Sequence, residues 1–564
     1  MNTHQLKNKI RGSLIGGAIG DALGYPIEFL SLSSIRKKYG EKGITEFSLS
    51  PKGKALISDD TQMTLFTANG LLFGVTRWFT SDSIMGDLDS YVHYAYREWF
   101  ETQIDAPIEE QRYYTCWLRK IPELNVERAP GNTCMSALGE LSQRYGVQND
   151  SKGCGGVMRV APVGLMAATY FNHYGEKNGR DWTSQRVAYL AGACAALTHK
   201  HPLGYMSAAF HALLIYKIVL CENPITPAEF DRLCESSLAE LPQLYEKPEE
   251  KTALEELQSI VRKALSLAEN EEPASTVIPY LGQGWVGEET VAIALYCAKK
   301  NLNNFEQAVI DAVNHDGDSD STGSVCGNII GAIVGYDAIP DYYKQNVELA
   351  DIILEIADDL NTICPLGECV NSKSSIIVQN RWRSKYIEAQ PYNNEQFWLS
   401  LAEQLGQFRK GKITQQELIN MFPELEITDG WRKYSSIKEA IDLTIPQECP
   451  LSLIPKIVIA ACKEEKGEVN LVELHIEVSY QPEWSNLHQI GRLVNMCQTK
   501  EPVSFYHVGI LKFRDSDELF VELRMCIKEG SHGDEDGYDV GSDTWLVGIL
   551  KEDGTWLRKW YVEL

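Results

Sequence analysis

Two rows of glycines, each with a spacing of four residues, constrain the fold of this chain more than any other feature of its sequence. They lie in two apolar stretches, one near residue 20 and one near residue 330: Gly12, Gly16, Gly20, Gly24, Gly323, Gly327, Gly331 and Gly335. A spacing of four places residues on one face of a helix. Because glycine costs about 1 kcal/mol relative to alanine inside a helix, such a row needs a compensating interaction. We therefore predict two core helices whose backbones approach closely, each next to acidic residues.

Residues 1–370 have the pattern of a helical domain. Apolar residues recur there at helical periods, and strands do not alternate with helices. The clearest predicted helices are 62–73, 187–197, 206–220, 248–267, 289–299, 305–313 and 324–334.

The character of the sequence changes after about residue 370. Residues 371–445 are polar, with predicted helices over 394–407 and 414–422. Alternating apolar residues then predict strands over 472–480, 505–513, 519–527, 544–550 and 555–562, with a hairpin turn at 551–554. We expect residues 371–564 to form a smaller α+β domain, whose strands pair sequentially in an antiparallel sheet.

The charge of the chain limits its partners. Its 564 residues include 53 Lys plus Arg and 78 Asp plus Glu, a formal net charge of −25. The sequence therefore carries no basic footprint for nucleic acid or for an anionic membrane. Residues 1–12 lack an apolar signal region, and the 14 cysteines include no CxxC pair. We expect a cytoplasmic protein without disulfides.

Two acidic motifs precede predicted helices. The first is SDDT at 58–61, and the second is HDGDSDST at 315–322. Either could simply cap its helix. Carboxylate and hydroxyl oxygens without a Cys or His array also suit a hard cation, Mg²⁺ or alternatively Mn²⁺, and together the two motifs could supply both halves of a two-metal site. The second motif lacks the EF-hand spacing. A further acidic run at 532–537 is interpreted as a solvated loop.

Four motifs together resemble the ADP-ribosylglycohydrolase family, in particular its dinitrogenase reductase-activating type. They are GSLIGGAIGDALGYPIEF at 12–29, SDDT at 58–61, GCGGVMRVAPVGL at 153–165 and HDGDSDSTGSVCGNIIGA at 315–332. The resemblance covers about residues 1–370 and leaves 371–564 unassigned. It implies a compact, globular all-α fold with two Mg²⁺ ions in a cleft, and hydrolysis of the bond between ADP-ribose and an acceptor.

The resemblance also implies a set of metal ligands drawn from both acidic motifs: Ser58, Asp59, Asp60, Asp318, Asp320 and Ser321. Threonine is the usual residue where Ser58 and Ser321 stand, and serine keeps the hydroxyl oxygen. Asp60 and Asp318 are carried over as catalytic residues together with Glu28. Glu28 would position water or protonate the leaving group, and its alternative is a buried acid paired with an arginine. Asp21 would fix the glycine-rich helix or support the ligands.

The same resemblance suggests residues that bind the rest of the substrate. Backbone N–H groups of a glycine-rich loop can approach phosphate, although GCGG is also a common turn. The residues implied are Gly153, Gly155, Gly156, Met158, Arg159 and His201. His199 and His201 lack further ligands at zinc spacing. Trp285 is either a stacking surface for adenine or ribose, or a core residue.

The resemblance implies a Mg²⁺-dependent hydrolase that removes ADP-ribose from a modified protein, with arginine and its N-glycosidic bond as the expected linkage because bacterial-looking members of the family are often of that type. O-linked ADP-ribose on serine and small-molecule adducts are alternatives. So is an immunity protein that binds an ADP-ribosyltransferase toxin. Because residues 371–564 carry no recognisable site, we expect that their deletion spares hydrolysis of a small substrate.

Overall fold

The computed structural model describes most of the first 391 residues and only selected elements beyond them. The described residues are 3–80, 87–108, 113–140, 148–175, 183–367, 381–391, 400, 401, 403, 404, 407, 412–422, 426–429, 440–445, 471–476, 503–512, 519–527, 543–550 and 556–563. The contacts divide the chain into two units. The first comprises Met1–Gly367 and Trp382–Pro391, and the second comprises Glu368–Arg381 and Tyr392–Leu564.

The described part of the first unit is built from helices. They are α1 Thr3–Gly24, α2 Leu32–Tyr39, α3 Asp59–Thr80, α4 Leu88–Gln103, α5 Asn132–Glu140, α6 Ala161–Tyr174, α7 Ser184–Ala196, α8 Pro202–Leu220, α9 Pro227–Glu240, α10 Pro248–Leu267, α11 Ala274–Val277, α12 Gly287–Lys300, α13 Phe305–Val313, α14 Ser319–Val334, α15 Asp341–Asn346 and α16 Ala350–Leu360. All seven predicted helices are confirmed. The pattern misplaced the start of α14, which begins at Ser319, so that Asp320 lies in its first turn.

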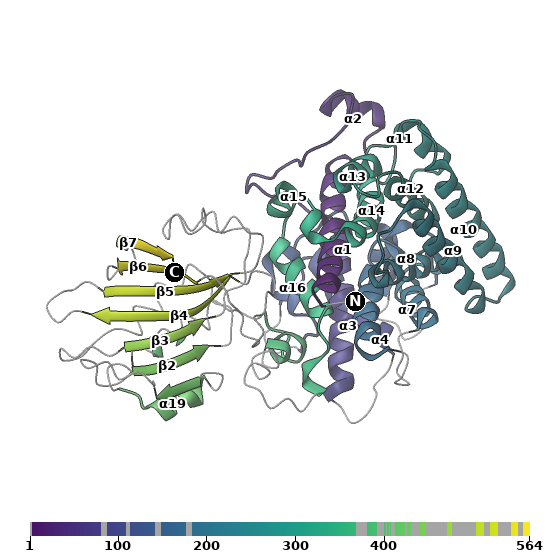
Figure 1. Ribbon diagram of the computed structural model, residues 1–564. Helices are drawn as coiled ribbons and strands as arrows, with labels where there is room; N and C mark the ends of the chain where they lie inside the picture. The colour runs from purple at the N-terminus through teal and green to yellow at the C-terminus, as the bar shows by residue number, and fades with distance from the viewer. Residues whose placement is uncertain are drawn as a thin grey trace. The chain divides into compact units, whose positions relative to one another are not determined.

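Helices α1 and α14 pack side by side through the two glycine rows (Figure 1). A Cβ atom on Gly12, Gly16 or Gly20 would lie closer than 3.0 Å to the backbone carbonyl of Gly331, Gly327 or Gly323, respectively. The pairing is therefore antiparallel, and the predicted close approach is confirmed. Gly335 differs from the rest of its row, because it ends α14 with a φ of +80°.

The antiparallel packing brings the C-terminal end of α1 to the N-terminal end of α14. A Cβ atom on Gly24, the last residue of α1, would collide with the backbone of Ser319 and Asp320. The short 3₁₀ helix η1, Tyr25–Ile27, follows directly and leads to Glu28. The glycine rows thus place Asp21 and Glu28 next to the second acidic motif.

Helix α8 lies in the core of the unit. Two helical segments, Cys154–Tyr174 and Pro202–Leu220, are long and apolar enough to cross a membrane by length and composition, but 89% and 83% of their apolar windows are buried inside the protein. A helix that is apolar on all sides is typical of such a core position.

Residues beyond the predicted boundary at 370 complete the first unit. The indole Nε1 of Trp382 donates to Thr76 Oγ1 at 2.6 Å. The ammonium of Lys385 is fully buried and pairs with Glu355 at 3.1 Å and with Asp359, to which Tyr386 also donates at 2.7 Å. Trp382–Pro391 therefore belongs to the helical unit, which extends past residue 370.

In the second unit the structure describes one helix and seven strands. They are α19 Gln415–Met421, β1 Glu426–Asp429, β2 Ala440–Ile445, β3 Leu471–Ile476, β4 Val503–Lys512, β5 Leu519–Ile527, β6 Asp543–Leu550 and β7 Trp556–Glu563. Strands β4 to β7 pair sequentially and antiparallel. β2 and β3 pair in parallel, which departs from the purely antiparallel arrangement that we expected.

Other expectations for this unit fall outside the described residues. These are the first half of the helix at 394–407, the acidic run at 532–537 and the turn at 551–554. The side chains of the seven strands also lie outside that part of the chain, so an α+β domain with its own core stays a prediction.

Candidate active site

Asp21 of α1 fixes the start of α3, where the first acidic motif lies. Its carboxylate accepts from the backbone N–H groups of Ser58, at 3.0 and 3.1 Å, and of Thr61, at 3.1 Å, and from the Thr61 hydroxyl. Asp21 has no exposed surface, and burial raises its pKa to about 6 although these hydrogen bonds oppose the shift. Asp21 therefore supports the motif from the side of α1, as expected.

Three of the four polar residues of the first motif, Ser58, Asp59 and Asp60, are the candidate metal ligands. Ser58 Oγ accepts from the backbone N–H of Asp60 at 3.2 Å, so Ser58 also acts as a helix cap. Asp59 Oδ2 accepts from the N–H of Gly131 at 3.2 Å. Asp60 is 2% exposed, and its Oδ2 has no hydrogen-bond partner among the described residues.

The second motif caps α14. Asp318 Oδ1 accepts from the N–H of Ser321 at 3.2 Å, and Asp318 Oδ2 accepts from the Cys154 thiol at 2.8 Å. Asp320 Oδ1 accepts from the same N–H at 3.0 Å. The hydroxyl of Ser321 reaches the sulfur of Met158 at 3.9 Å. Capping and metal binding are therefore compatible here, because each carboxylate keeps oxygen lone pairs that these bonds do not use.

Glu28 joins the second motif to form a compact acidic cluster. One carboxylate oxygen from each of Glu28, Asp318 and Asp320 lies within 4.8 Å of the others. Glu28 is 9% exposed, and its Oε2 has no partner among the described residues. Glu28 forms no described ion pair with an arginine, so the geometry does not favour its interpretation as an ordinary buried acid.

The carboxyl groups of the site hold their protons unusually strongly. Burial, together with the charges of Asp318, Asp59 and Asp21, raises the pKa of Glu28 to about 9. Burial raises the pKa of Asp59 to about 8. It also raises the pKa values of Asp60 and Asp320 well above their usual range, and neighbouring carboxylates add to that shift. Carboxylates this close need either protons or a cation.

The donor set fits a hard divalent cation. Within the described part of the chain, none of Glu28, Asp59, Asp60, Asp318 and Asp320 pairs with lysine or arginine, and two of their oxygens are buried without a partner. Oxygen donors of this kind suit Mg²⁺ or Mn²⁺. Burial raises the pKa of Cys154 well above its usual range, so this residue remains a thiol that donates to Asp318.

The glycines of the GCGG loop have a packing role. A Cβ atom on Gly155 would lie 2.9 Å from the ring of His199 and 3.0 Å from the sulfur of Cys134, and one on Gly153 would lie 3.2 Å from His199 Nε2. The N–H of Gly153 donates to Ser151 at 3.4 Å, while Gly155 and Gly156 are buried. Phosphate binding by this loop stays a prediction.

Met158 and Arg159 face the interior. Arg159 is fully buried, lies 4.3 Å from the centroid of the Tyr96 ring and donates to Thr198 Oγ1 at 2.6 Å. Met158 is 2% exposed and its carbonyl accepts from Thr64. The structure therefore offers no exposed atom of Arg159 for the direct substrate contact that we expected.

The two histidines also have structural partners. His201 caps α8, because its Nδ1 accepts from the N–H of Leu203 at 3.1 Å. His199 is 2% exposed, and burial together with the charge of Arg159 lowers its pKa to about 3. His199 is therefore a neutral imidazole, with Nδ1 bonded to Thr198.

Trp285 is exposed, as a stacking surface requires, but it already has an aromatic neighbour. Its ring stacks on Phe29, which directly follows Glu28, with centroids 5.9 Å apart. Sequence reasoning missed Phe29, and its position next to the acidic residue of the first glycine motif was the available signal. It also missed the contacts of Gly131 and Cys154 with the aspartates.

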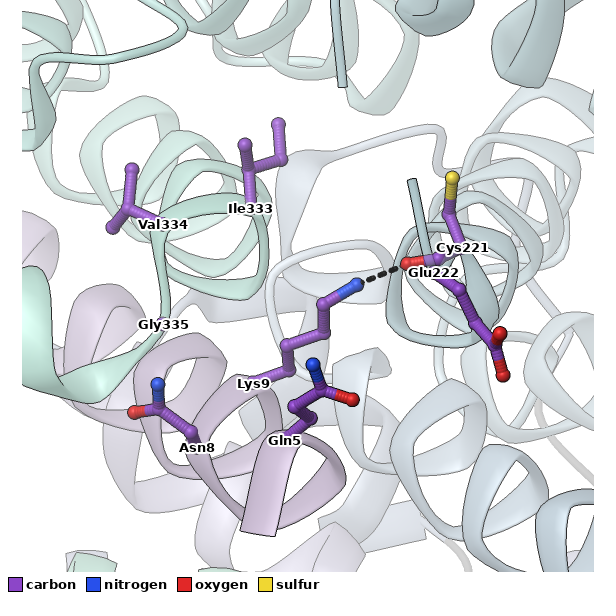
Figure 2. A pocket seen from close by; sticks show the side chains of 8 residues that line it. All are labelled: Gln5, Asn8, Lys9, Cys221, Glu222, Ile333, Val334 and Gly335. Atoms are coloured by element: carbon purple, nitrogen blue, oxygen red, sulfur yellow. Dashed lines mark hydrogen bonds between the residues drawn. The ribbon is translucent and has the colours of Figure 1, made fainter. Parts of the chain in front are cut away.

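A separate small cavity of about 110 Å³ lies near the other ends of α1 and α14 (Figure 2). Lys9 reaches across it and donates to the carbonyls of Ile218 at 3.0 Å and Cys221 at 2.5 Å, at the C-terminal end of α8. The cavity is lined by none of the acidic residues described above. Lys9 therefore caps the C-terminal end of α8 at this cavity, which is distinct from the acidic cluster.

The sequence matches one family model and several known proteins. The family model described as ADP-ribosylglycohydrolase matches residues 2–368. An uncharacterized protein of Archaeoglobus fulgidus is 26% identical over 367 residues, which are 63% of this chain and 96% of that protein. ADP-ribosyl-[dinitrogen reductase] glycohydrolase of Rhodospirillum rubrum is 23% identical, over 62% of this chain and 93% of its own length. ADP-ribosylhydrolase ARH3 of Bos taurus is 24% identical, over 35% of this chain and 54% of its own length.

Proposed function

This chain belongs to the ADP-ribosylglycohydrolase family, and on that premise we propose that it releases ADP-ribose from arginine side chains of a modified protein, using two Mg²⁺ ions. It is a glycosidic-bond hydrolase. The single observation that carries the proposal is the set of buried carboxylates of Glu28 and of the starts of α3 and α14, which lack a described cationic partner.

The proposed ligands come from both helix starts. Ser58, Asp59 and Asp60 would hold one side of the metal centre, and Asp318, Asp320 and Ser321 would hold the other. When bound, the ions would orient the ribose hydroxyl groups and help to hold a water near C1″. Asp21 maintains the first half of this set through its hydrogen bonds to Ser58 and Thr61.

Glu28 is the proposed acid or base. Cleavage breaks the C1″–N bond and adds the elements of water, so that one proton reaches the leaving nitrogen and a hydroxyl group reaches C1″. A carboxyl group with a raised pKa can hold that proton at neutral pH. Burial is the largest cause of the raised pKa of Glu28, and it would still favour the protonated form with cations bound nearby.

The proposed acceptor is arginine, and the main alternative is ADP-ribose linked to serine. Both reactions would use the same carboxylates, so the acidic cluster does not separate them. The proposed acceptor is tested directly by comparing the two substrates.

The experiment measures ADP-ribose release from an arginine-ADP-ribosylated protein in Mg²⁺ and after chelation. We expect activity only with the metal, and a loss of about 10²-fold or more in Asp59→Asn and in Asp318→Asn. Glu235→Gln is the control, because Glu235 is an exposed residue paired with Arg262. A folded wild-type protein that releases no ADP-ribose with Mg²⁺ or Mn²⁺ would contradict the proposal.

A further inference from the structure

Two exposed aromatic rings stack on each other beside the acidic cluster. Phe29 is 74% exposed and Trp285 is 39% exposed. Their ring centroids lie 5.9 Å apart, and the planes are inclined by only 20°. No lysine or arginine of the described segments stacks on either ring. The pair therefore presents aromatic surface to solvent, mostly from Phe29, on which no described cation stacks.

The backbone around Phe29 ties this ring to the candidate site. Phe29 directly follows Glu28, a member of the acidic cluster. A few residues later, the N–H of Leu32 donates to Asp316 Oδ1 at 2.7 Å. Asp316 belongs to the same loop as Asp318. The short segment that carries Phe29 is thus held at both ends by the acidic site.

Hydrogen bonds also tie the loop that carries Trp285 to the site. The carbonyl of Gln283 accepts from the N–H of Asp318 at 2.8 Å, and the carbonyl of Trp285 accepts from the N–H of Cys154 at 3.2 Å. Glu289 Oε2 accepts from the N–H groups of Gln283 and Gly284. Residues 283–285 therefore have a defined position against the cap of α14.

The location next to the carboxylates identifies which end of the substrate meets the rings. In ADP-ribose, two riboses and a pyrophosphate separate adenine from C1″. The proposed chemistry places C1″ at the cluster. A surface adjoining Glu28 and Asp318 is therefore suited to the acceptor group attached to C1″, not to the distant adenine.

The charges beside the rings favour a cationic acceptor. Asp316, an exposed carboxylate outside the proposed set of metal ligands, lies in the loop that holds the segment of Phe29. Lys152, in the loop that precedes Cys154, pairs with Glu288. A guanidinium group is flat, stacks on aromatic faces and is stabilised by cation–π attraction. A serine oxygen has neither the charge nor a face.

We propose that Phe29 and Trp285 bind the guanidinium of the ADP-ribosylated arginine and thereby select this acceptor, an inference that rests on the proposed function. The two residues act in binding and specificity. They take no part in breaking the bond, which is the proposed role of Glu28 and the metal centre.

The test compares an arginine-linked and a serine-linked ADP-ribosyl peptide of otherwise identical sequence, with Mg²⁺ present. We expect Phe29→Ala and Trp285→Ala to raise KM for the arginine-linked peptide by about 3- to 20-fold with little change in kcat. The same variants should change KM for the serine-linked peptide, and the affinity for free ADP-ribose, by less than about 2-fold. Trp285→Phe, which keeps a ring, should restore most of the arginine preference.

Tyr280→Ala is the matched control, because Tyr280 is 65% exposed and forms no described ring stack. An equal loss on both peptides, an unchanged KM, or weaker binding of free ADP-ribose would overturn the inference. If the wild type released ADP-ribose from neither peptide, the proposed function would fail. Binding of the arginine-linked peptide, followed by fluorescence, would then still decide: equal affinity in wild type and Phe29→Ala overturns the role of the rings.

Discussion

Gly20 of α1 and Gly323 of α14 face each other so closely that a Cβ atom on either would lie within 3.0 Å of the other's carbonyl. This contact is the last full step of the glycine rows before the acidic site. The same packing that holds the two helices together therefore also sets the separation between Glu28 and Asp318.

Replacement of Gly20 by alanine should destabilise the protein. The new methyl group would collide with backbone, which cannot move aside as a flexible side chain can, so we expect a loss of about 1–3 kcal/mol in the free energy of unfolding. Chemical denaturation measures it. Gly139→Ala in α5 is the control: its Cβ would meet Phe100 at an ordinary 3.5 Å, and alanine should stabilise that helix. Equal effects of both substitutions would refute the packing argument.

The stability of the metal-free protein should fall as pH rises. Glu28 and Asp59 have folded pKa values of about 9 and about 8, whereas carboxyl groups of the unfolded chain ionise near pH 4. Between about pH 4 and 9 the folded state therefore binds more protons, and the free energy of unfolding decreases with pH. Denaturation midpoints in chelator measure this slope. The double variant Glu28→Gln, Asp59→Asn should flatten it, and an unchanged slope would contradict the assignment.

Magnesium binding should show the opposite dependence on pH. Cations compete with protons for the same carboxylates, so the apparent affinity should rise between about pH 6 and 9 with release of protons. Calorimetry in buffers of different ionisation enthalpy counts those protons. Binding that neither releases protons nor depends on pH would indicate that the metal occupies another site.

Glu28 and Asp318 should differ in their roles. Glu28→Gln keeps the size of the side chain but cannot exchange a proton, so we expect kcat to fall by about 10²–10⁴-fold while Mg²⁺ affinity changes by less than about tenfold. Asp318→Asn should lower both. The measurements are kcat and calorimetric Mg²⁺ affinity for each variant. Equal loss of metal affinity in the two variants would make Glu28 a ligand instead.

The stability of a truncated chain should depend on whether it ends at residue 370 or at residue 391. A chain that ends at residue 370 lacks Lys385, so Asp359 loses its buried cation and the hydrogen bond from Tyr386. Leaving a buried charge unpaired is strongly destabilising, by about 3–5 kcal/mol. A chain that ends at residue 391 keeps both contacts. We would compare the two truncated chains by thermal unfolding and by their rates of hydrolysis. Equal stability of the two chains would refute a stabilising role for Lys385 and Tyr386.

The sequence alone predicted those parts of the fold and site whose signals are local. Helical periodicity located α10 and α13 to the residue, and the two acidic motifs gave Asp59 and Asp318. The glycine spacing even predicted the close packing of α1 on α14, because a regular row of glycines weakens a helix unless another backbone packs against it.

Contacts that depend on distant partners left no such signal. Lys385 lies in a polar segment, where a lysine indicates solvent, and its burial becomes visible only once α16 supplies Asp359. The glycines of the GCGG loop suggest phosphate as readily as packing, and only the position of His199 shows the packing. The stack of Phe29 on Trp285 joins residues that lie 256 positions apart in the sequence.

The pairing of α1 with α14 also determines when the site can form during synthesis. Ser13 and Asn328, which bond to each other in that interface, are 315 positions apart. A ribosome therefore exposes the glycine face of α1 long before its partner helix exists, and contacts of such high sequence separation form slowly. The nascent chain carries Asp59 and Asp60 without the second half of the cluster until translation has passed α14. A metal centre that uses both acidic motifs would therefore have to wait until α14, which ends at Val334, has been translated.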